Sequence, residues 1–154
     1  DGLTLSASYY DFGEMGNKDG RQKQEGGSLA ANYSIGQVSV GYGETKHAPS
    51  QRMTNISGSH IQHYENDAYS IGFAVNDNLA ISYTEETSER KQKAKAAATG
   101  VTTRTDVEME MTTIDLSYTM GGATLGLSNS ETSNASYISG DDTTETIVAI
   151  SLAF

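Results

Sequence analysis

The sequence predicts an all-β protein, an antiparallel up-and-down β-barrel that crosses a membrane on its strands. Three observations lead to this fold class. Large apolar side chains alternate with small ones in segments that cover most of the chain. Long and short connections follow each other between these segments, and the basic residues lie in or next to the long connections. Membrane barrels show these three features together, because each strand has one face in lipid and one in water.

Eight segments show the period-two alternation that is typical of strands. In the first, Leu3, Leu5 and Tyr9 share one face, and the other carries small hydroxyl residues and Tyr10. The closing stretch "ETIVAISLAF" repeats the pattern with larger apolar groups. The predicted strands lie near residues 2–12, 27–35, 38–46, 67–76, 78–88, 108–120, 123–133 and 144–154.

The connections predict which strand ends lie together. Three are tight: one at Gly36, one in "NDN" and one at Gly121 and Gly122, all residue types that tolerate left-handed backbone. The other four are long and polar, and all ten Lys and Arg residues lie in them or at strand ends that lead to them. We therefore expect the tight turns at one end of the sheet and the long loops at the other, as in outer-membrane barrels.

The composition excludes several classes of protein. A net charge of −10 and a pI near 4.6 disfavour a nucleic-acid partner. The absence of cysteine excludes disulfides and zinc–thiolate sites. No stretch approaches the roughly 20 apolar residues of a membrane helix. The mean hydropathy of −0.49 is that of a water-soluble chain, but a barrel strand needs only every second residue to be apolar.

Two kinds of barrel fit the alternation. In one the apolar face meets lipid, and in the other it encloses a greasy ligand inside a soluble carrier. The small-residue face favours the first, because a soluble barrel would expose that face to water and cover it with charges. Within the predicted strands this face carries Ser, Gly, Thr and Ala, with Asp115 as its one charge between two stretches of regular alternation.

The same small residues bear on the size of the barrel. Side chains fill the interior of an eight-stranded barrel, and Ser, Gly and Ala are too small to do so. We therefore expect the eight strands to be half of a wider, water-filled barrel of about sixteen. The opening "DGL", which is typical of the end of a tight turn, agrees with this expectation. The alternative is a small eight-stranded outer-membrane protein that anchors or binds and does not conduct.

The stretch "IDLSYTMGGATLGLSNSETSNASYISGDDTTETIVAISLAF" resembles the C-terminal end of Gram-negative general porins, in particular those of α-proteobacteria. The resemblance rests on "SYTMGG", the acidic "SGDDTTE" and the closing alternation through Phe154. It implies a trimeric, sixteen-stranded channel of the outer membrane that passes small hydrophilic solutes by diffusion, with its long loops outside the cell and its turns in the periplasm. It also implies that the assembly machinery reads Val148, Ile150, Leu152 and Phe154.

Candidate pore-lining residues follow from the parity of the alternation. Asp115 shares the small-residue face with Thr113 and Ser117, and it would bias a pore toward cations. Four further residues continue that face toward the long loops, where charges at a mouth would set ionic selectivity: Thr45, Glu86, Arg90 and Glu145. Each could equally be a solvated wall residue. The acidic balance of the chain predicts a mild preference for cations.

Other sites have weaker patterns. Asp141 and Asp142 could bind Ca²⁺ through carboxylate oxygens, and His47, His60 and His63 have a loose metal-ligand spacing. The basic run from Arg90 to Lys95 could hold lipopolysaccharide phosphates. No nucleophile elbow, phosphate-binding glycine loop or confidently paired carboxylates are present, so an enzyme is not expected.

Overall fold

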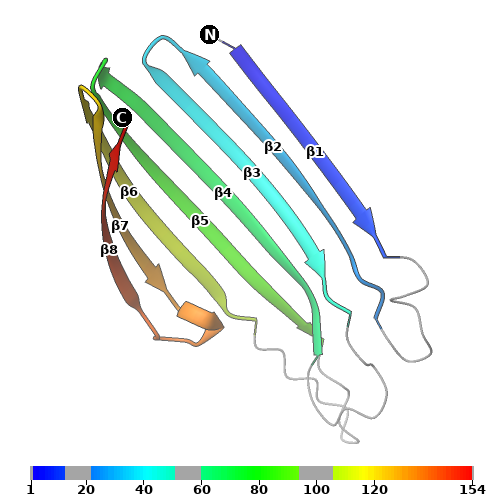
Figure 1. The fold of residues 1–154 in the computed structure, drawn as a ribbon. Coiled ribbons are helices and arrows are strands. Elements are labelled where there is room, and N and C mark those ends of the chain that lie inside the picture. Colours follow the sequence, from blue (N-terminus) through cyan, green and yellow to red (C-terminus); the bar gives the residue numbers. More distant parts are fainter. Residues whose placement is uncertain (1, 13–21, 51–59, 94–105, 154) are drawn as a thin grey trace, which may run out of the picture.

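The computed structural model describes residues 2–12, 22–50, 60–93 and 106–153, and it places them in a single eight-stranded sheet (Figure 1). A short 3₁₀ turn, η2 (Ala135–Tyr137), precedes the last strand. The strands are β1 (Gly2–Asp11), β2 (Glu25–Ile35), β3 (Val38–Ala48), β4 (His60–Asn76), β5 (Leu79–Lys93), β6 (Glu108–Met120), β7 (Ala123–Ser133) and β8 (Thr143–Leu152).

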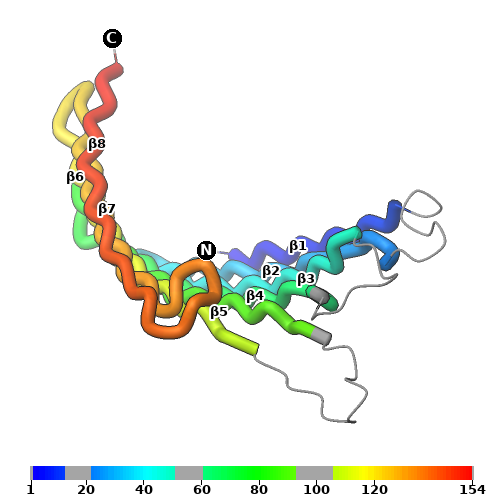
Figure 2. Tube along the Cα trace, turned by 90° about the horizontal axis from the view of Figure 1, so that it is seen from below, coloured from blue at the N-terminus to red at the C-terminus, as the bar shows by residue number. Residues whose placement is uncertain are grey.

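Every strand pairs antiparallel with the next strand in the sequence, so the spatial order is β1 to β8. The prediction of eight antiparallel up-and-down strands is confirmed. The sheet does not close on itself: β1 and β8 are its two edges in the described residues, and no pairing joins them. Viewed from the loop end, the sheet is an open trough whose two edge strands stand well apart (Figure 2).

The tight turns lie together at one end of the trough, as the sequence predicts (Figure 1). Gly36 and Gly121 have φ values of 57° and 59° in the β2–β3 and β6–β7 turns, a conformation that costs glycine little. The β4–β5 turn differs from expectation, because none of its residues adopts positive φ. The side chain of Asn76 closes it instead, with Oδ1 accepting from the backbone N–H groups of Asn78 (2.9 Å) and Leu79 (3.0 Å).

The strand bounds agree with the sequence closely at the turn end and poorly at the loop end. β6 and β7 begin and end at the predicted residues. β4 begins at His60 instead of residue 67, and β5 continues to Lys93 instead of residue 88. The prediction that the polar residues of these extensions lie in loops is therefore wrong. They pair as a ladder because the opposite strand offers each one a matching backbone partner, from Asn66↔Ser88 to His63↔Lys91.

No large apolar side chain is buried in the described part of the chain. The sheet is one layer thick, and both of its faces are open. A soluble domain needs a second layer to cover its apolar face, and a single sheet with an uncovered greasy face is not stable in water. Residues 2–12, 22–50, 60–93 and 106–153 include no helix long and apolar enough to cross a membrane.

Candidate functional site: the two faces of the sheet

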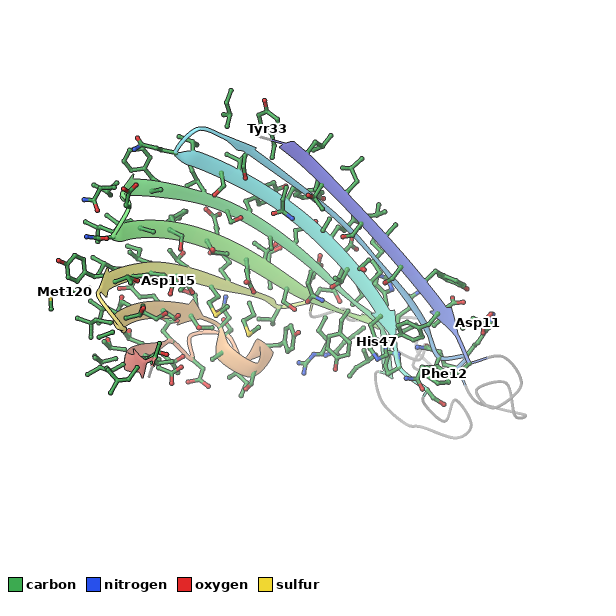
Figure 3. The ribbon with its side chains drawn as sticks, turned by 45° about the horizontal axis from the view of Figure 1, so that its top comes forward. Asp11, Phe12, Tyr33, His47, Asp115 and Met120 are labelled. Atoms are coloured by element: carbon green, nitrogen blue, oxygen red, sulfur yellow. The ribbon has the colours of Figure 1, made fainter. Side chains whose placement is uncertain are left out.

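The two faces of the trough differ sharply in chemistry. Tyr33 and Met120 point away from the trough, whereas Asp115 lies inside it (Figure 3). The first two belong to the set of apolar alternation positions and the third to the set of small positions. The convex face is therefore the apolar one, and the concave face carries the small and polar side chains.

The convex face is apolar over its turn-end half. One row of cross-strand neighbours consists of large apolar residues on seven successive strands. Leu5 and Ile150, from the two edge strands, expose 70% and 71% of their surfaces. A water-facing surface rarely has a continuous apolar patch of this extent. The row is Ile35, Val38, Phe73, Ile81, Leu116, Leu127 and Val148.

Tyrosines lie where the convex face changes from apolar to charged. The rings of Tyr42 and Tyr69 lie 5.1 Å apart between centroids. The Tyr42 hydroxyl donates to Asp67 Oδ1 at 3.1 Å, and the Tyr83 hydroxyl donates to Glu85 at 3.3 Å. The hydroxyls of Tyr42 and Tyr83 thus reach toward carboxylates on the loop side of the apolar region. This orientation is the one that tyrosine takes at a boundary between apolar and aqueous surroundings.

Beyond the tyrosines the convex face carries ion pairs. Lys46 lies 2.9 Å from Glu65 and 3.2 Å from Glu44, and Lys23 lies 2.6 Å from Asp11. The hydrogen bond from Lys46 holds the pKa of Glu65 below its ordinary value, and the same bond raises the pKa of Lys46. Both carboxylate and ammonium are therefore charged at neutral pH in this region.

The concave face carries mainly small and polar side chains across the full width of the sheet. Its large apolar exceptions on β6 and β8 are Met109, Met111 and Ile147. Its Ser, Gly and Ala positions near the turn end line an open hollow of about 390 Å³. Hydroxyls pair across the strands, as in Ser8 with Ser28 at 2.7 Å and Thr113 with Ser130 at 2.9 Å. One row of cross-strand neighbours on this face joins all eight strands: Thr4, Asn32, Gly41, Ser70, Thr84, Thr113, Ser130 and Glu145.

The candidate pore-lining residues all lie on the concave face, at different heights. Thr113 and Glu145 share a row through Ser130. Asp115 lies one row nearer the turn end, where it accepts a hydrogen bond from Ser82 Oγ at 3.4 Å, with Ser117 one row further on. A second group lies nearer the loops, on β3 and β5: Thr45, Glu86 and Arg90. The structure therefore does not bring Asp115 together with the charges at the loop end.

A band of aromatic rings crosses the concave face at its loop end. Tyr10 contacts Phe12 and His47, with centroids 5.5 and 6.1 Å apart, and its hydroxyl hydrogen-bonds to His47 Nδ1. His47 and Tyr64 lie 6.5 Å apart with nearly parallel rings. Gly26 lies under the Tyr10 side chain, where a Cβ would come within 2.6 Å of the hydroxyl oxygen. The aromatic band replaces the small residues found lower on this face.

Sequence reasoning missed this band. The predicted strands leave residues 47–66 in a loop, and with them His47 and Tyr64. Tyr10 is predicted on the small-residue face of the first strand, but no aromatic band is predicted around it. The signal was present in the parity of the fourth strand, because Tyr64 is in phase with Asn66, Ala68 and Ser70 on the small-residue face. Extending the alternation through polar residues would have found it.

The β7–β8 connection folds over the concave face and completes the band. Tyr137 reaches β4 and β5, where its ring lies 5.7 Å from that of Tyr64 and its hydroxyl lies 2.7 Å from Ser88 Oγ. Asn134, Ser136 and Tyr137 have φ values of 54°, 57° and 60°. For side chains other than glycine this conformation costs on the order of 1–3 kcal/mol each, so surrounding contacts must hold it.

The aspartates suggested as calcium ligands lie in this connection. Asp142 Oδ1 accepts from the backbone N–H of Asn134 at 3.1 Å, and the Asp141 carbonyl accepts from Ala135 N–H at 2.6 Å. Both interactions shape the connection. Within the described ranges, no group of three or more His, Asp or Glu side chains is arranged to hold a metal ion.

The histidines do not form a cluster either. His47 lies on the concave face in the aromatic band, whereas His63 lies on the convex face, 3.7 Å from Glu65. A metal site built from these two side chains is therefore wrong, because the sheet separates them. Of His60, the structure describes the backbone only.

The residues of the suggested assembly signal lie on β8. Val148, Ile150 and Leu152 share the convex face with Leu127 and Leu125 of the adjacent strand, and all three are well exposed. Phe154 lies outside the described residues, as do residues 94–105 with Lys95 of the basic run. The other three basic residues of the run, Arg90, Lys91 and Lys93, lie on β5.

No family model, no curated protein and no solved structure matches the chain.

Proposed function

We propose that the chain forms part of a porin of the bacterial outer membrane, a water-filled channel through which small hydrophilic solutes and ions diffuse. The observation that carries this proposal is the chemistry of the two faces. A single layer of sheet with an apolar convex face and a polar concave face needs two solvents, and a membrane pore supplies both.

The order of residues along the convex face supports the proposal that lipid covers this face, and not a second layer of protein. Going from turns to loops, the face passes from large apolar groups through tyrosines to ion pairs. Membrane barrels have the same three zones, an apolar band flanked by aromatic girdles and then water. A row of cross-strand neighbours crosses the boundary obliquely, from Leu5 on β1 through Tyr42 and Tyr69 to Glu85 on β5. Strands tilted 35–45° in a bilayer produce this slant.

The open trough supports a wide channel over a compact eight-stranded barrel. The edge strands do not approach each other (Figure 2), and the concave side chains are too small to fill a narrow interior. Closure needs further strands between β8 and β1. Because these two edges run antiparallel, an even number of added strands would continue the alternation, and a total of about sixteen is the usual number for such channels.

The same proposal assigns partners and orientation. The long loops face the cell exterior, and the turns and the end of β8 face the periplasm. Lipid and lipopolysaccharide cover the convex face, and the assembly machinery reads Val148, Ile150, Leu152 and Phe154. The channel is a homotrimer. Lys23 and Lys46 are already paired with carboxylates, so lipopolysaccharide phosphates would compete with those pairs.

Conductance in planar bilayers tests the function. The protein, extracted in detergent from the membranes of cells that make it, should open discrete channels whose conductance rises in proportion to salt concentration, with a mild preference for cations. Folded protein that inserts in the bilayer without conducting would overturn the proposal and favour a non-conducting anchor. Protein that stays folded and monodisperse without detergent would exclude the lipid-facing orientation altogether.

A further inference from the structure

The β7–β8 connection is a strap that lies across the concave face. Residues 134–142 follow the end of β7, with η2 lying at the loop end beside β6 (Figure 1). From there Tyr137 reaches side chains of β5 and β4. Its hydroxyl lies 2.7 Å from Ser88 Oγ, and its ring lies 5.7 Å from Tyr64. Ser88, at 8% exposure, is the one polar residue of the described chain that is buried.

Arg90 holds the same tyrosine from the loop side. Its guanidinium carbon lies 4.8 Å from the centre of the Tyr137 ring, and one of its nitrogens donates to the Tyr137 carbonyl at 3.5 Å. A cation over an aromatic face is an attractive arrangement, and the ring in turn limits where the guanidinium can lie. The positive charge of Arg90 is therefore kept at a defined place on the concave wall.

Hydrogen bonds of Asn134 and Asp142 also fix the strap, both to β6 and within itself. The Asn134 side chain donates to the Glu108 carbonyl on β6 at 2.9 Å, and its Oδ1 accepts from the Gly140 N–H at 3.0 Å. Asp142 caps the Asn134 N–H. The three non-glycine residues with positive φ in the described chain all lie in this strap. Such conformations persist only when the surrounding contacts fix them, and they gather where a precise shape is used.

We propose that this strap, pinned by Tyr137 to Ser88 and Arg90, sets the size limit of the channel at its loop-end mouth. The inference rests on the proposed channel function. Lower on the wall the side chains are Ser, Gly and Ala, which leave the lumen wide. At the level of Tyr137 the strap adds a layer of backbone and a tyrosine ring over the wall, so solutes meet the narrower passage there. The fixed guanidinium adds a positive charge at the same level.

Two variants test the strap by different means. In Tyr137→Ala the ring and its hydroxyl are lost, and the strap loses its contacts with β4 and β5. In the second variant, residues 134–141 are replaced by the two residues Asn-Gly. A two-residue turn then connects Ser133 to Asp142. A two-residue turn suits the register there, because Thr132 and Thr143 are already opposite each other. Tyr137→Phe separates the two pins, since it loses the hydroxyl contact with Ser88 and keeps the ring contacts with Tyr64 and Arg90.

The measurements are single-channel conductance in planar bilayers and the size of neutral polymer that still enters the pore. We expect both variants to conduct more than the wild type and to admit larger polymer, and Tyr137→Phe to lie between them and the wild type. If the wild type conducts and the strap-shortened channel keeps the wild-type conductance and polymer limit, the inference is overturned. If the wild type does not conduct, the channel function fails first. If Tyr137→Ala does not fold, the strap-shortened variant decides alone, because all strand pairs remain in it.

Discussion

The two ends of each strand differ more than any two strands do. Toward the turns, the convex face is large and apolar and the concave face is small. Toward the loops, the convex face has ion pairs such as Lys46–Glu65, and the concave face has aromatic rings such as Tyr10 and Tyr64. Antiparallel pairing continues through both ends, apart from two register shifts between β4 and β5, so the change lies in the side chains. In the proposed channel, the boundary between lipid and water would cross the strands near Tyr42, Tyr69 and Tyr83.

The largest effect should come from a charge in the apolar half. Ile81 lies on β5 between Phe73 and Leu116 on the convex face, and Ser82, the next residue, faces the trough. In Ile81→Lys an ammonium group would face acyl chains, at a cost of about 2–4 kcal/mol near the midplane. Ser82→Lys is the matched control, and it should cost far less because its amine would lie in water beside Asp115. Denaturant unfolding from lipid vesicles measures both, and equal losses of stability would remove the distinction between the faces.

The next largest effect should come from the tyrosine pair at the proposed boundary. Tyr42 and Tyr69 lie 5.1 Å apart, and such ring pairs contribute roughly 0.5–1.5 kcal/mol beyond the area that they bury. A double-mutant cycle of Tyr42→Ala and Tyr69→Ala should give a coupling energy in that range. Tyr42→Phe should keep the coupling and lose the hydroxyl bond to Asp67. A coupling energy near zero would mean that the rings lie at the boundary without supporting each other.

A substitution at Asp115 tests whether the concave face of the turn half contributes to ion selectivity, as charges at the loop-end mouth would. The Asp115 carboxylate lies on the concave face of the turn half, away from Arg90. A unit charge about 8 Å from a permeating ion, screened at physiological salt, changes the ratio of cations to anions by about twofold. Asp115→Asn, which keeps the shape of the side chain, should therefore lower the cation preference by that factor and leave the conductance nearly unchanged. Reversal potentials across a salt gradient measure the ratio, and an unchanged ratio would place Asp115 away from the ion path.

The smallest effect should be the pH dependence of the convex ion pairs. The Lys46 hydrogen bond lowers the pKa of Glu65 in the folded chain below the ordinary 4.5. The pair therefore stabilises the fold fully above pH 4.5, and this contribution is lost as the pH falls through the lower folded-state pKa. Exposed pairs are weak, so the loss should be smaller than that of the tyrosine variants. Unfolding at pH 7 and pH 3 should show a shallower dependence for Lys46→Met than for the wild type.

The apolar half of the fold could be predicted from sequence, and the loop half could not. Alternation of large and small residues located β6 and β7 to the residue, because a one-residue slip would put Leu116 or Leu125 on the wrong face. In β4 and β5 beyond Asn66 and Ser88, the convex face is charged and the concave face carries the ring of Tyr64, so the alternation of large apolar and small residues disappears while the hydrogen-bonded ladder continues. The aromatic band was missed for this reason. The strap was missed because Tyr137 contacts residues 49 positions away in sequence.

The face assignment of the candidate site followed from parity alone, and Asp115, Glu86 and Glu145 lie where parity predicts. Parity does not show which residues of different strands lie at the same level between turns and loops. That depends on the register between the strands. Register brings Thr113 level with Glu145 and separates Asp115 from Arg90. The curvature that leaves β1 and β8 apart also depends on the whole sheet, and no local pattern encodes it.

The central claim is that the convex face of the turn half touches acyl chains. Because the 154 residues contain no cysteine, single spin labels can be attached at Ile81→Cys and at Ser82→Cys in vesicles containing the protein. Collisions with molecular oxygen and with a water-soluble nickel complex then report the surroundings of each label. The account predicts high oxygen and low nickel accessibility at position 81, and the opposite at position 82. High nickel accessibility at position 81 would contradict it, since that side chain would then lie in water.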